Sequence, residues 1–277
     1  MNQPVRLGAV AYLNAQPLVH GLGPGVSVRF DVPSVCATLL ARGEIDLGLI
    51  PTIAYFDRPG DRIVPGVSIA SDGEVASVAL FARQPVREIR TIALDTSSRT
   101  SVVLTRILCA RRFEIAPTFV PHAPDLSAML AACDAALLIG DPALFADLEA
   151  VGSGRMGKIA KIDLGLAWRD LTGLPFVWAV WAGGPEGADP TVVEALARAR
   201  DAGVAQSDAI ADAYCAHEPS HQPVARRYLR ENMRYGLTGP MLEGLNRFFE
   251  EAAVLDLAPR SREIGFFAAS ERTNRRA

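Results

Sequence analysis

The sequence predicts an α/β protein of two lobes, each a mostly parallel sheet flanked by helices, with a ligand cleft between the lobes. Three observations lead to this prediction. Apolar strands alternate with helical segments between residues 5 and 51, and the same alternation returns between residues 91 and 139. Beyond residue 181 the alternation stops, and helical segments continue to about residue 257. Alternating strands and helices form parallel sheets with right-handed crossovers. The chain is therefore expected to build one lobe, cross to a second, and return to complete the first.

The first alternating unit contains three expected strands. They are apolar runs at residues 5–10, 26–32 and 43–51. A helix is expected between the second and third strands, over residues 33–42, with Ser34 as its cap. Two further strands, at residues 64–70 and 75–81, surround the turn Ser71-Asp72-Gly73-Glu74. This second pair lies where the chain is expected to approach the other lobe.

The second unit repeats the alternation. Its expected strands lie at residues 91–94, 118–120 and 134–139, with a helix over residues 126–132. An apolar strand ends at Trp181, and the helices that follow are expected to break near Gly203, Pro219 and Gly239. We therefore expect lobe I to comprise residues 1–83 and 177–277, and lobe II to comprise residues 84–176.

The composition is that of a soluble globular protein. The chain has 277 residues, of which 49% are hydrophobic and 21% charged, and a formal net charge of -3. Its basic residues are dispersed, apart from Arg272, Arg275 and Arg276 near the end, so nucleic acid is not an expected partner. The four cysteines lie far apart and are expected to be buried free thiols. No stretch has the pattern of a leader peptide or a membrane span, which predicts a cytoplasmic protein without membrane insertion.

A cluster of hydroxyl side chains follows the strand at residues 91–94. It comprises Thr96, Ser97, Ser98, Thr100 and Ser101, and the amphipathic run after it predicts a helix. The first N–H groups of a helix lack internal partners and attract anions. One Ser or Thr is enough for an N-cap, so the surplus of hydroxyls favours a site for a carboxylate or phosphate. An ordinary cap is the alternative.

Other polar residues follow the carboxyl ends of expected strands, where α/β sheets bind ligands. Asn14, Pro51, Gly140 and Asp141 have this position, and Ser77 lies in the strand near the crossing. Each has a structural alternative: Asn14 and Asp141 could cap helices, and Ser77 could bond a backbone carbonyl.

Arg99, inside the hydroxyl cluster, is expected to form a structural salt bridge to Asp95 or Asp141 rather than to contact a ligand. Trp168, Phe176, Trp178 and Trp181 are expected in the core or at the hinge, with one of them reaching the cleft.

Several catalytic patterns are absent from the sequence. It contains no phosphate-loop lysine motif, no dinucleotide glycine fingerprint, no Gly-x-Ser-x-Gly elbow and no His-Glu-x-x-His. The four histidines are scattered and lie outside the strand-end positions. The sequence therefore implies neither a metal nor a nucleotide cofactor.

Five motifs occur in order along nearly the whole chain: Tyr12-Leu13-Asn14 with Pro17-Leu18, Ser71 to Val78, Leu94 to Ser101, Leu138-Ile139-Gly140-Asp141, and Trp168 with Thr172 to Phe176. Together they resemble the MqnA family of chorismate dehydratases, from the futalosine route to menaquinone. The resemblance implies a type II periplasmic-binding-protein-like fold. It also implies a cofactor-free lyase that converts chorismate to 3-[(1-carboxyvinyl)oxy]benzoate and water.

The resemblance also assigns roles to the candidate residues. The hydroxyl cluster, with Pro51, Gly140 and Asp141, is implied to bind substrate, and donors there would stabilise the charge that grows on a substrate carboxylate. We hypothesise that the substrate's own enolpyruvyl carboxylate takes the proton, positioned by Asn14 and Ser77. Asp141 is the rival base.

Two other functions remain open at this stage. One is a solute-binding protein for a small carboxylate without catalysis. The other is the sister enzyme, 1,4-dihydroxy-6-naphthoate synthase, which needs a protein base. The sequence does not decide between a monomer and a homodimer.

Overall fold

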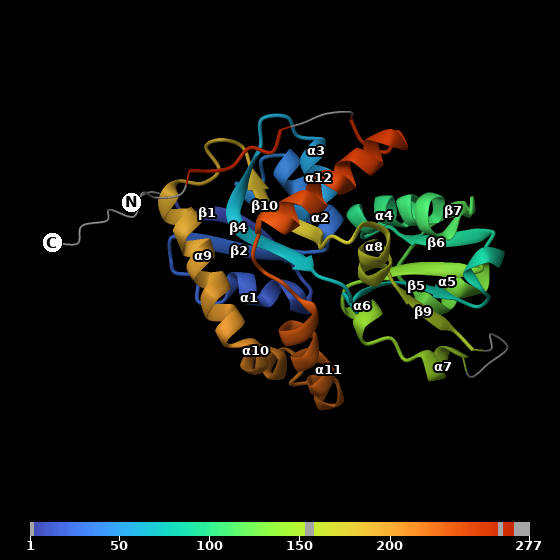
Figure 1. The fold of residues 1–277 in the computed structure, drawn as a ribbon. Helices are drawn as coiled ribbons and strands as arrows, with labels where there is room; N and C mark the ends of the chain where they lie inside the picture. Colours follow the sequence, from blue (N-terminus) through green and yellow to red (C-terminus); the bar gives the residue numbers. More distant parts are fainter. Residues whose placement is uncertain (1–2, 153–157, 260–262, 269–277) are drawn as a thin grey trace.

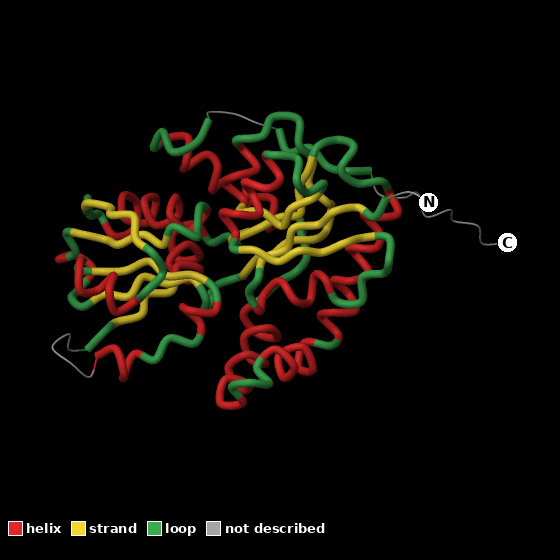
Figure 2. Tube along the Cα trace, turned by 180° about the vertical axis from the view of Figure 1, so that it is seen from behind, coloured by secondary structure: helices red, strands yellow, loops and turns green. Residues whose placement is uncertain are grey.

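Two five-stranded sheets form separate lobes in the computed structural model of the chain (Figure 1), which describes residues 3–152, 158–259 and 263–268. The strand order is β2-β1-β3-β10-β4 in the first sheet and β7-β6-β8-β5-β9 in the second. From behind, each sheet lies between helices of its own lobe (Figure 2). The expected two-lobed α/β fold is therefore confirmed.

The first lobe combines the start and the end of the chain. Its strands are β1 (Val5–Val10), β2 (Val26–Asp31), β3 (Leu47–Pro51), β4 (Arg62–Ser71) and β10 (Phe176–Gly183). Its helices are α1 (Gln16–Val19), α2 (Pro33–Ala41), α3 (Thr52–Phe56), α9 (Pro190–Ala205), α10 (Ser207–Tyr214), α11 (Gln222–Arg227) and α12 (Gly239–Val254). Strand β1 pairs in parallel with both β2 and β3, as the alternating pattern predicted.

The second lobe is built from the middle of the chain. Its strands are β5 (Val78–Ala82), β6 (Thr91–Asp95), β7 (Thr118–His122), β8 (Ala135–Ile139) and β9 (Ala160–Asp163). Its helices are α4 (Thr100–Leu108), α5 (Leu126–Ala132), α6 (Asp141–Leu144), α7 (Leu148–Gly152) and α8 (Leu164–Thr172). Strand β6 pairs in parallel with β7 and β8.

One strand in each sheet runs against its neighbours because the chain reaches it from the other lobe. Strand β10 is antiparallel to β3 and β4, and β5 is antiparallel to β8 and β9. Parallel strands of both lobes end at the cleft, so a strand that arrives across the cleft starts there and runs in the opposite direction. Every residue of β10 is buried, which explains its unbroken apolar sequence.

The position of β5 differs from the expected boundary after residue 83. This strand pairs only with strands of the second lobe, so the first crossing lies between Ser71 and Val78. The return crossing lies between Thr172 and Phe176. We therefore propose lobe boundaries within these two short segments.

One local expectation was wrong, and one helix was not predicted. Ser34 does not cap α2, whose cap residue is Val32. The break expected near Gly203 lies at Gln206, between α9 and α10. At Gly203 itself a side chain would collide with the Pro17 carbonyl, 2.0 Å from an ideal Cβ. Glycine at this position allows α1 and α9 to pack closely. Helix α8, which the sequence reasoning missed, begins at the Asp163 cap, whose side chain accepts the Leu166 N–H.

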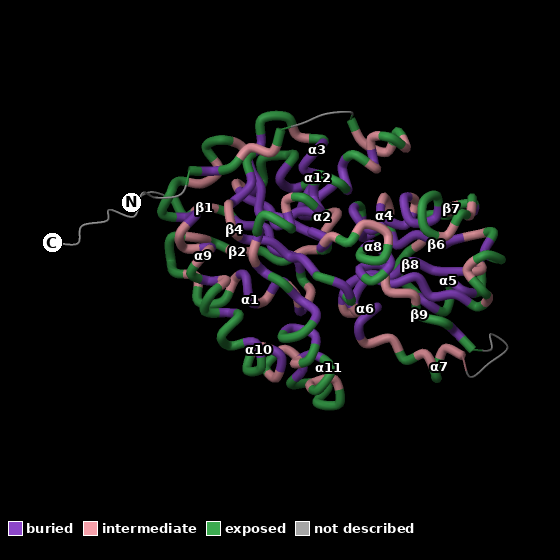
Figure 3. Tube along the Cα trace, viewed as in Figure 1, coloured by how far each residue is buried: buried purple, intermediate pink, exposed green. Residues whose placement is uncertain are grey.

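Buried residues concentrate in the inner strands of both sheets, while the edge strands β2, β7 and β9 contain none (Figure 3). All four cysteines are buried and free, as expected, and burial raises the pKa of Cys36 to about 12. Among the described residues, no helix has the length and apolar character needed to cross a membrane. The tail beyond residue 268, with its three arginines, and the first two residues lie outside the described part of the chain.

Candidate active site

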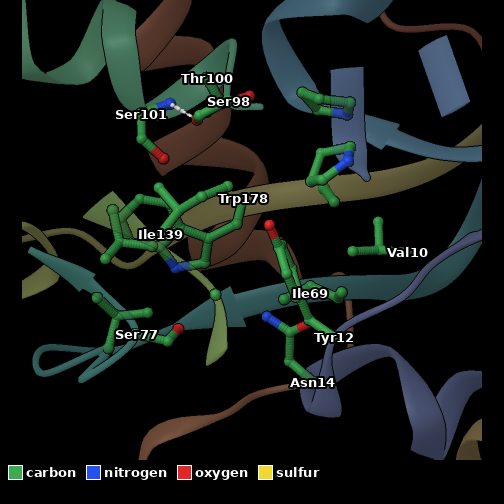
Figure 4. Close-up of a pocket in the computed structure, with 16 residues that line it drawn as sticks. Val10, Tyr12, Asn14, Ile69, Ser77, Ser98, Thr100, Ser101, Ile139 and Trp178 are labelled. Carbon is green, nitrogen blue, oxygen red and sulfur yellow. Dashed lines mark hydrogen bonds between the residues drawn. The ribbon is translucent and has the colours of Figure 1, made fainter. Parts of the chain in front are cut away.

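A cavity lies between the lobes at the carboxyl ends of the parallel strands. Its volume is about 60 Å³, smaller than typical small-molecule sites, so a substrate of the size of chorismate requires the lobes to move apart. In Figure 4, Ser98, Thr100 and Ser101 approach it from the second lobe, while Tyr12 and Asn14 approach from the first. Its lining residues are Val10, Tyr12, Asn14, Pro33, Pro51, Ile69, Val75, Ser77, Val78, Ser98, Thr100, Ser101, Ile139, Gly140, Trp178 and Ala179.

The second-lobe wall is the N-terminus of helix α4. Its preceding loop is shaped by Asp95, whose Oδ1 accepts hydrogen bonds from Ser97 N and Ser97 Oγ at 2.8 and 2.6 Å. Ser98 Oγ accepts the Ser101 N–H at 3.3 Å, the bond drawn in Figure 4. Ser98, Thr100 and Ser101 thus present hydroxyls to the cavity beside the positive end of the helix dipole.

The other members of the hydroxyl cluster do not line the cavity. Thr96 is exposed, and its N–H donates to the His122 carbonyl in the neighbouring strand. The Ser97 hydroxyl donates to Asp95 Oδ1. The Ser97 carbonyl accepts the Ser34 N–H from the other lobe at 3.1 Å. Burial raises the pKa of Asp95, against the opposing effect of these hydrogen bonds. Part of the predicted cluster therefore shapes the loop.

Ser77 is held where the chain enters the second lobe. The preceding Ala76 has a φ of +59°, a left-handed conformation that is costly for a residue other than glycine and that recurs at functional sites. Asp163 holds this segment by accepting the Val75 and Ala76 N–H groups at 3.1 and 2.7 Å. Ser77 is 1% exposed, and its hydroxyl lies 2.7 Å from the hydroxyl of Tyr228.

Asn14 lies in a short 3₁₀ turn, Leu13–Ala15, after β1. The cap of that turn is Tyr12, so the cap alternative for Asn14 was wrong. Asn14 Oδ1 is buried and has no hydrogen-bond partner among the described residues. Buried polar atoms are almost always paired, so an open acceptor on the cavity wall indicates a place for a ligand donor.

Asp141 lies outside the cavity lining and connects the lobes instead. Its Oδ1 accepts the Leu13 N–H at 3.1 Å, and its Oδ2 accepts the Tyr214 hydroxyl at 2.5 Å. It makes no cap bond to α6, whose cap residue is Gly140, so the capping alternative was wrong as well. Burial raises the pKa of Asp141, while its bonds from Tyr214 and Leu13 act to lower it.

Further contacts close the opposite side of the cavity. Thr100 Oγ1 accepts the Ile53 N–H at 3.2 Å. Arg99 pairs with Asp57 of the first lobe at 2.9 Å, so it is structural as expected, although Asp95 and Asp141 are not its partners. With the Asp141 bonds, these contacts hold the two lobes closed around the cavity.

Several lining residues were not singled out from the sequence. Tyr12 packs on Gly140 so closely that an added Cβ would lie 2.5 Å from its ring, and Val10 and Ile69 form apolar wall. Trp178, by contrast, was among the four aromatic residues of which one was expected to reach the cleft. It lines the cavity, and its Nε1 donates to Ser71 Oγ at 3.1 Å. Tyr12 belongs to the same motif as Asn14, Tyr12-Leu13-Asn14, so this motif could have predicted Tyr12 as a lining residue.

The lining contains neutral groups only. Among its described residues there is no Asp, Glu, His, Lys or Arg. Hydroxyl and amide groups provide the polarity, and aliphatic and aromatic side chains provide the remaining wall. Such a site binds anions through oriented dipoles and supplies no charged side chain as a base.

The fold is that of the periplasmic-binding-protein architecture, with a cavity between two lobes. The chain is similar to the periplasmic aliphatic sulphonate binding protein of Escherichia coli, with a TM-score of 0.61 and 14% identity over 98% of this chain and 96% of that one. It also resembles a Candida albicans protein with the generic periplasmic binding protein fold, with a TM-score of 0.64 and 11% identity over 94% and 92% of the two chains.

The sequence comparisons are more specific. The profile of the menaquinone biosynthesis family matches residues 5–254, and the chain belongs to this family. It is 34% identical over 269 residues to the chorismate dehydratase of Thermus thermophilus, a match that spans 93% of this chain and 98% of the relative. The resemblance to the MqnA family is thereby confirmed.

Proposed function

We propose that this chain is a chorismate dehydratase, a lyase that forms 3-[(1-carboxyvinyl)oxy]benzoate and water. The observation that carries the proposal is the full-length similarity to the Thermus thermophilus enzyme. The closed cavity between the lobes, with its neutral donors and apolar walls, supports it.

The lining suits the two ends of chorismate. The ring carboxylate of chorismate would bind beside Ser98, Thr100 and Ser101 at the N-terminus of α4, where hydroxyls and the helix dipole attract an anion. The enolpyruvyl carboxylate of chorismate would bind at the opposite side of the cavity, near Asn14 and Ser77. The apolar ring between them matches the walls formed by Ile69, Ile139 and Trp178.

The reaction requires a base at C3 and a leaving hydroxyl at C4. Breaking the C3–H bond sends its electron pair through the diene to the ring carboxylate, which becomes dienolate-like. The electron pair then returns through the ring and breaks the C4–O bond, so that the ring becomes aromatic. The proton from C3 and the hydroxyl from C4 together make one water. Donors at the α4 N-terminus bind the dienolate more strongly than the ground state, which lowers the barrier.

The enolpyruvyl carboxylate of the substrate is the base in our proposal. It is attached through oxygen to C3 and therefore reaches the C3 proton without help from a protein base. The neutral lining supports this assignment, and the Asp141 carboxylate is engaged by Leu13 and Tyr214 outside that lining. The side-chain N–H of Asn14 and the hydroxyl of Ser77 would hold the carboxylate in position by donating hydrogen bonds to it.

Incubation of the purified protein with chorismate tests the proposal. We expect a product with an aromatic spectrum and, by mass spectrometry, a mass lower by one water. Chorismate without protein and chorismate with the Ser77→Ala variant are the controls. Tight binding without turnover would instead identify a solute-binding protein. Turnover of the nucleoside-derived substrate of the sister enzyme, with chorismate unchanged, would identify 1,4-dihydroxy-6-naphthoate synthase.

A further inference from the structure

Tyr228 lies directly behind Ser77 and does not line the cavity. It begins a π-helical turn, Tyr228–Asn232, that follows α11 in the first lobe. Its side chain is 1% exposed, and its hydroxyl lies 2.7 Å from Ser77 Oγ. The contact joins the first lobe to the segment where the chain enters the second.

The backbone of Ser77 is fixed independently of Tyr228. The Ser77 N–H donates to the Val75 carbonyl at 2.7 Å, and its carbonyl accepts the Gly140 N–H at 2.8 Å. The remaining freedom is the torsion of the hydroxyl. A serine hydroxyl can donate in one direction only, and its partner behind the cavity decides which direction that is.

The single proton of Ser77 sets the direction of donation when substrate is bound. In the proposed function the Ser77 hydroxyl donates to the substrate carboxylate, so it has no second proton for Tyr228. The 2.7 Å contact must then be donated by the Tyr228 hydroxyl to Ser77 Oγ. Burial raises the pKa of Tyr228, so its hydroxyl keeps the proton that it donates.

We propose that Tyr228 is a positioning residue, which orients the Ser77 hydroxyl toward the substrate carboxylate by donating a hydrogen bond to its oxygen. This inference rests on the proposed function. It extends the machinery to a side chain outside the cavity and connects Tyr228, through the Ser77 hydroxyl, to the substrate carboxylate. Hydrogen bonds in such a chain strengthen one another.

The Tyr228→Phe variant removes this hydroxyl and preserves the ring. We expect kcat for chorismate to fall about tenfold, equivalent to about 1.4 kcal/mol, while KM changes less than about twofold. Tyr235→Phe is the matched control: Tyr235 is also buried, and its hydroxyl has no hydrogen-bond partner among the described residues. We expect Tyr235→Phe to keep the wild-type kcat.

A double-mutant cycle separates positioning from general stabilisation. In the Ser77→Ala background, Tyr228→Phe should lower kcat by less than about twofold, because the hydroxyl that it orients is already absent. The double variant leaves neither partner unsatisfied, so it is expected to remain folded. A further tenfold loss in that background, or an unchanged kcat in Tyr228→Phe, would overturn the inference. Failure of the wild-type protein to convert chorismate would instead refute the proposed function.

Discussion

The hydroxyl of Tyr214 donates to Asp141 Oδ2 across the interface between the lobes, at 2.5 Å. Asp141 follows β8 in the second lobe, and Tyr214 ends α10 in the first. The same carboxylate accepts the Leu13 N–H, one residue before Asn14. Asp141 thus connects closure of the lobes to the position of a proposed catalytic residue, and this position argues against its role as the base.

The Asp141→Asn variant distinguishes a connecting residue from a base. The amide oxygen can still accept the Leu13 N–H, so we expect kcat within about threefold of wild type. Asp141→Ala removes two hydrogen bonds between the lobes and should raise KM about tenfold. Steady-state kinetics with chorismate measure both effects. An Asp141→Asn protein that binds chorismate without turnover, beside an active Ser77→Ala protein, would show that Asp141 is the base.

The raised pKa of Asp141 predicts a pH dependence of stability. Burial disfavours its ionised form in the folded state. The folded protein therefore binds this proton more tightly than the unfolded chain, and its contribution to stability is lost as pH rises from about 4 through the folded pKa. Asp141→Asn has no such loss. Its Tm, relative to wild type, should be higher at pH 8 than at pH 4. A difference that is constant with pH would contradict the assignment.

Ser77 and Asn14 are expected to act on kcat. Removal of one donor from a site that stabilises developing charge costs on the order of a hundredfold, and we expect losses of about this size for Ser77→Ala and Asn14→Ala. Thr96→Ala is the control, because Thr96 belongs to the hydroxyl cluster but is exposed outside the cavity. Equal losses in all three variants would show that the effect does not depend on contact with the cavity.

Much of the fold could be predicted because hydrophobic patterning is local. The strands at residues 5–10 and 134–139 were placed within about one residue of β1 and β8. The sheet to which β5 belongs was not predictable in this way. Its apolar sequence fits a central strand of either lobe, and only the pairing with β8 and β9 decides between them.

The candidate site was predicted less completely. The strand-end rule selected Asn14, Pro51 and Gly140, which line the cavity. It could not separate Ser98 from Ser97, because a one-residue step turns one hydroxyl to the cavity and the other to Asp95. Tyr228 is 151 residues from Ser77 in the sequence, and no local pattern signals such a contact.

Arg99 is expected to contribute little to catalysis. Its ion pair with Asp57 is exposed, with 44% and 53% of the two side chains accessible, and such pairs contribute about 0–1 kcal/mol. We expect Arg99→Gln to raise KM for chorismate less than about threefold, with a smaller effect at high salt. Kinetics at low and high ionic strength measure this. A large loss of kcat would instead assign Arg99 a direct contact with the substrate.

Gly140 is expected to tolerate no side chain. Its φ of +66° and ψ of -150° belong to a region that is essentially restricted to glycine, and an added Cβ would lie 2.5 Å from the Tyr12 ring. Gly140→Ala should lower Tm by about 5 °C. It should also raise KM for chorismate about tenfold, because the displaced Tyr12 occupies the cavity and opposes closure.

Gly173→Ala separates these two effects. Gly173 has a φ of +73°, and an added Cβ would meet no atom within 4 Å, so alanine there has the cost of a left-handed backbone, about 1–2 kcal/mol, without a collision. We expect a lower Tm and an unchanged KM. Because Gly173 lies in the return crossing between the lobes, this control also tests whether strain in that segment alters the site. An equal rise in KM in both variants would locate the effect in the backbone of the closed form and not in the contact between Gly140 and Tyr12.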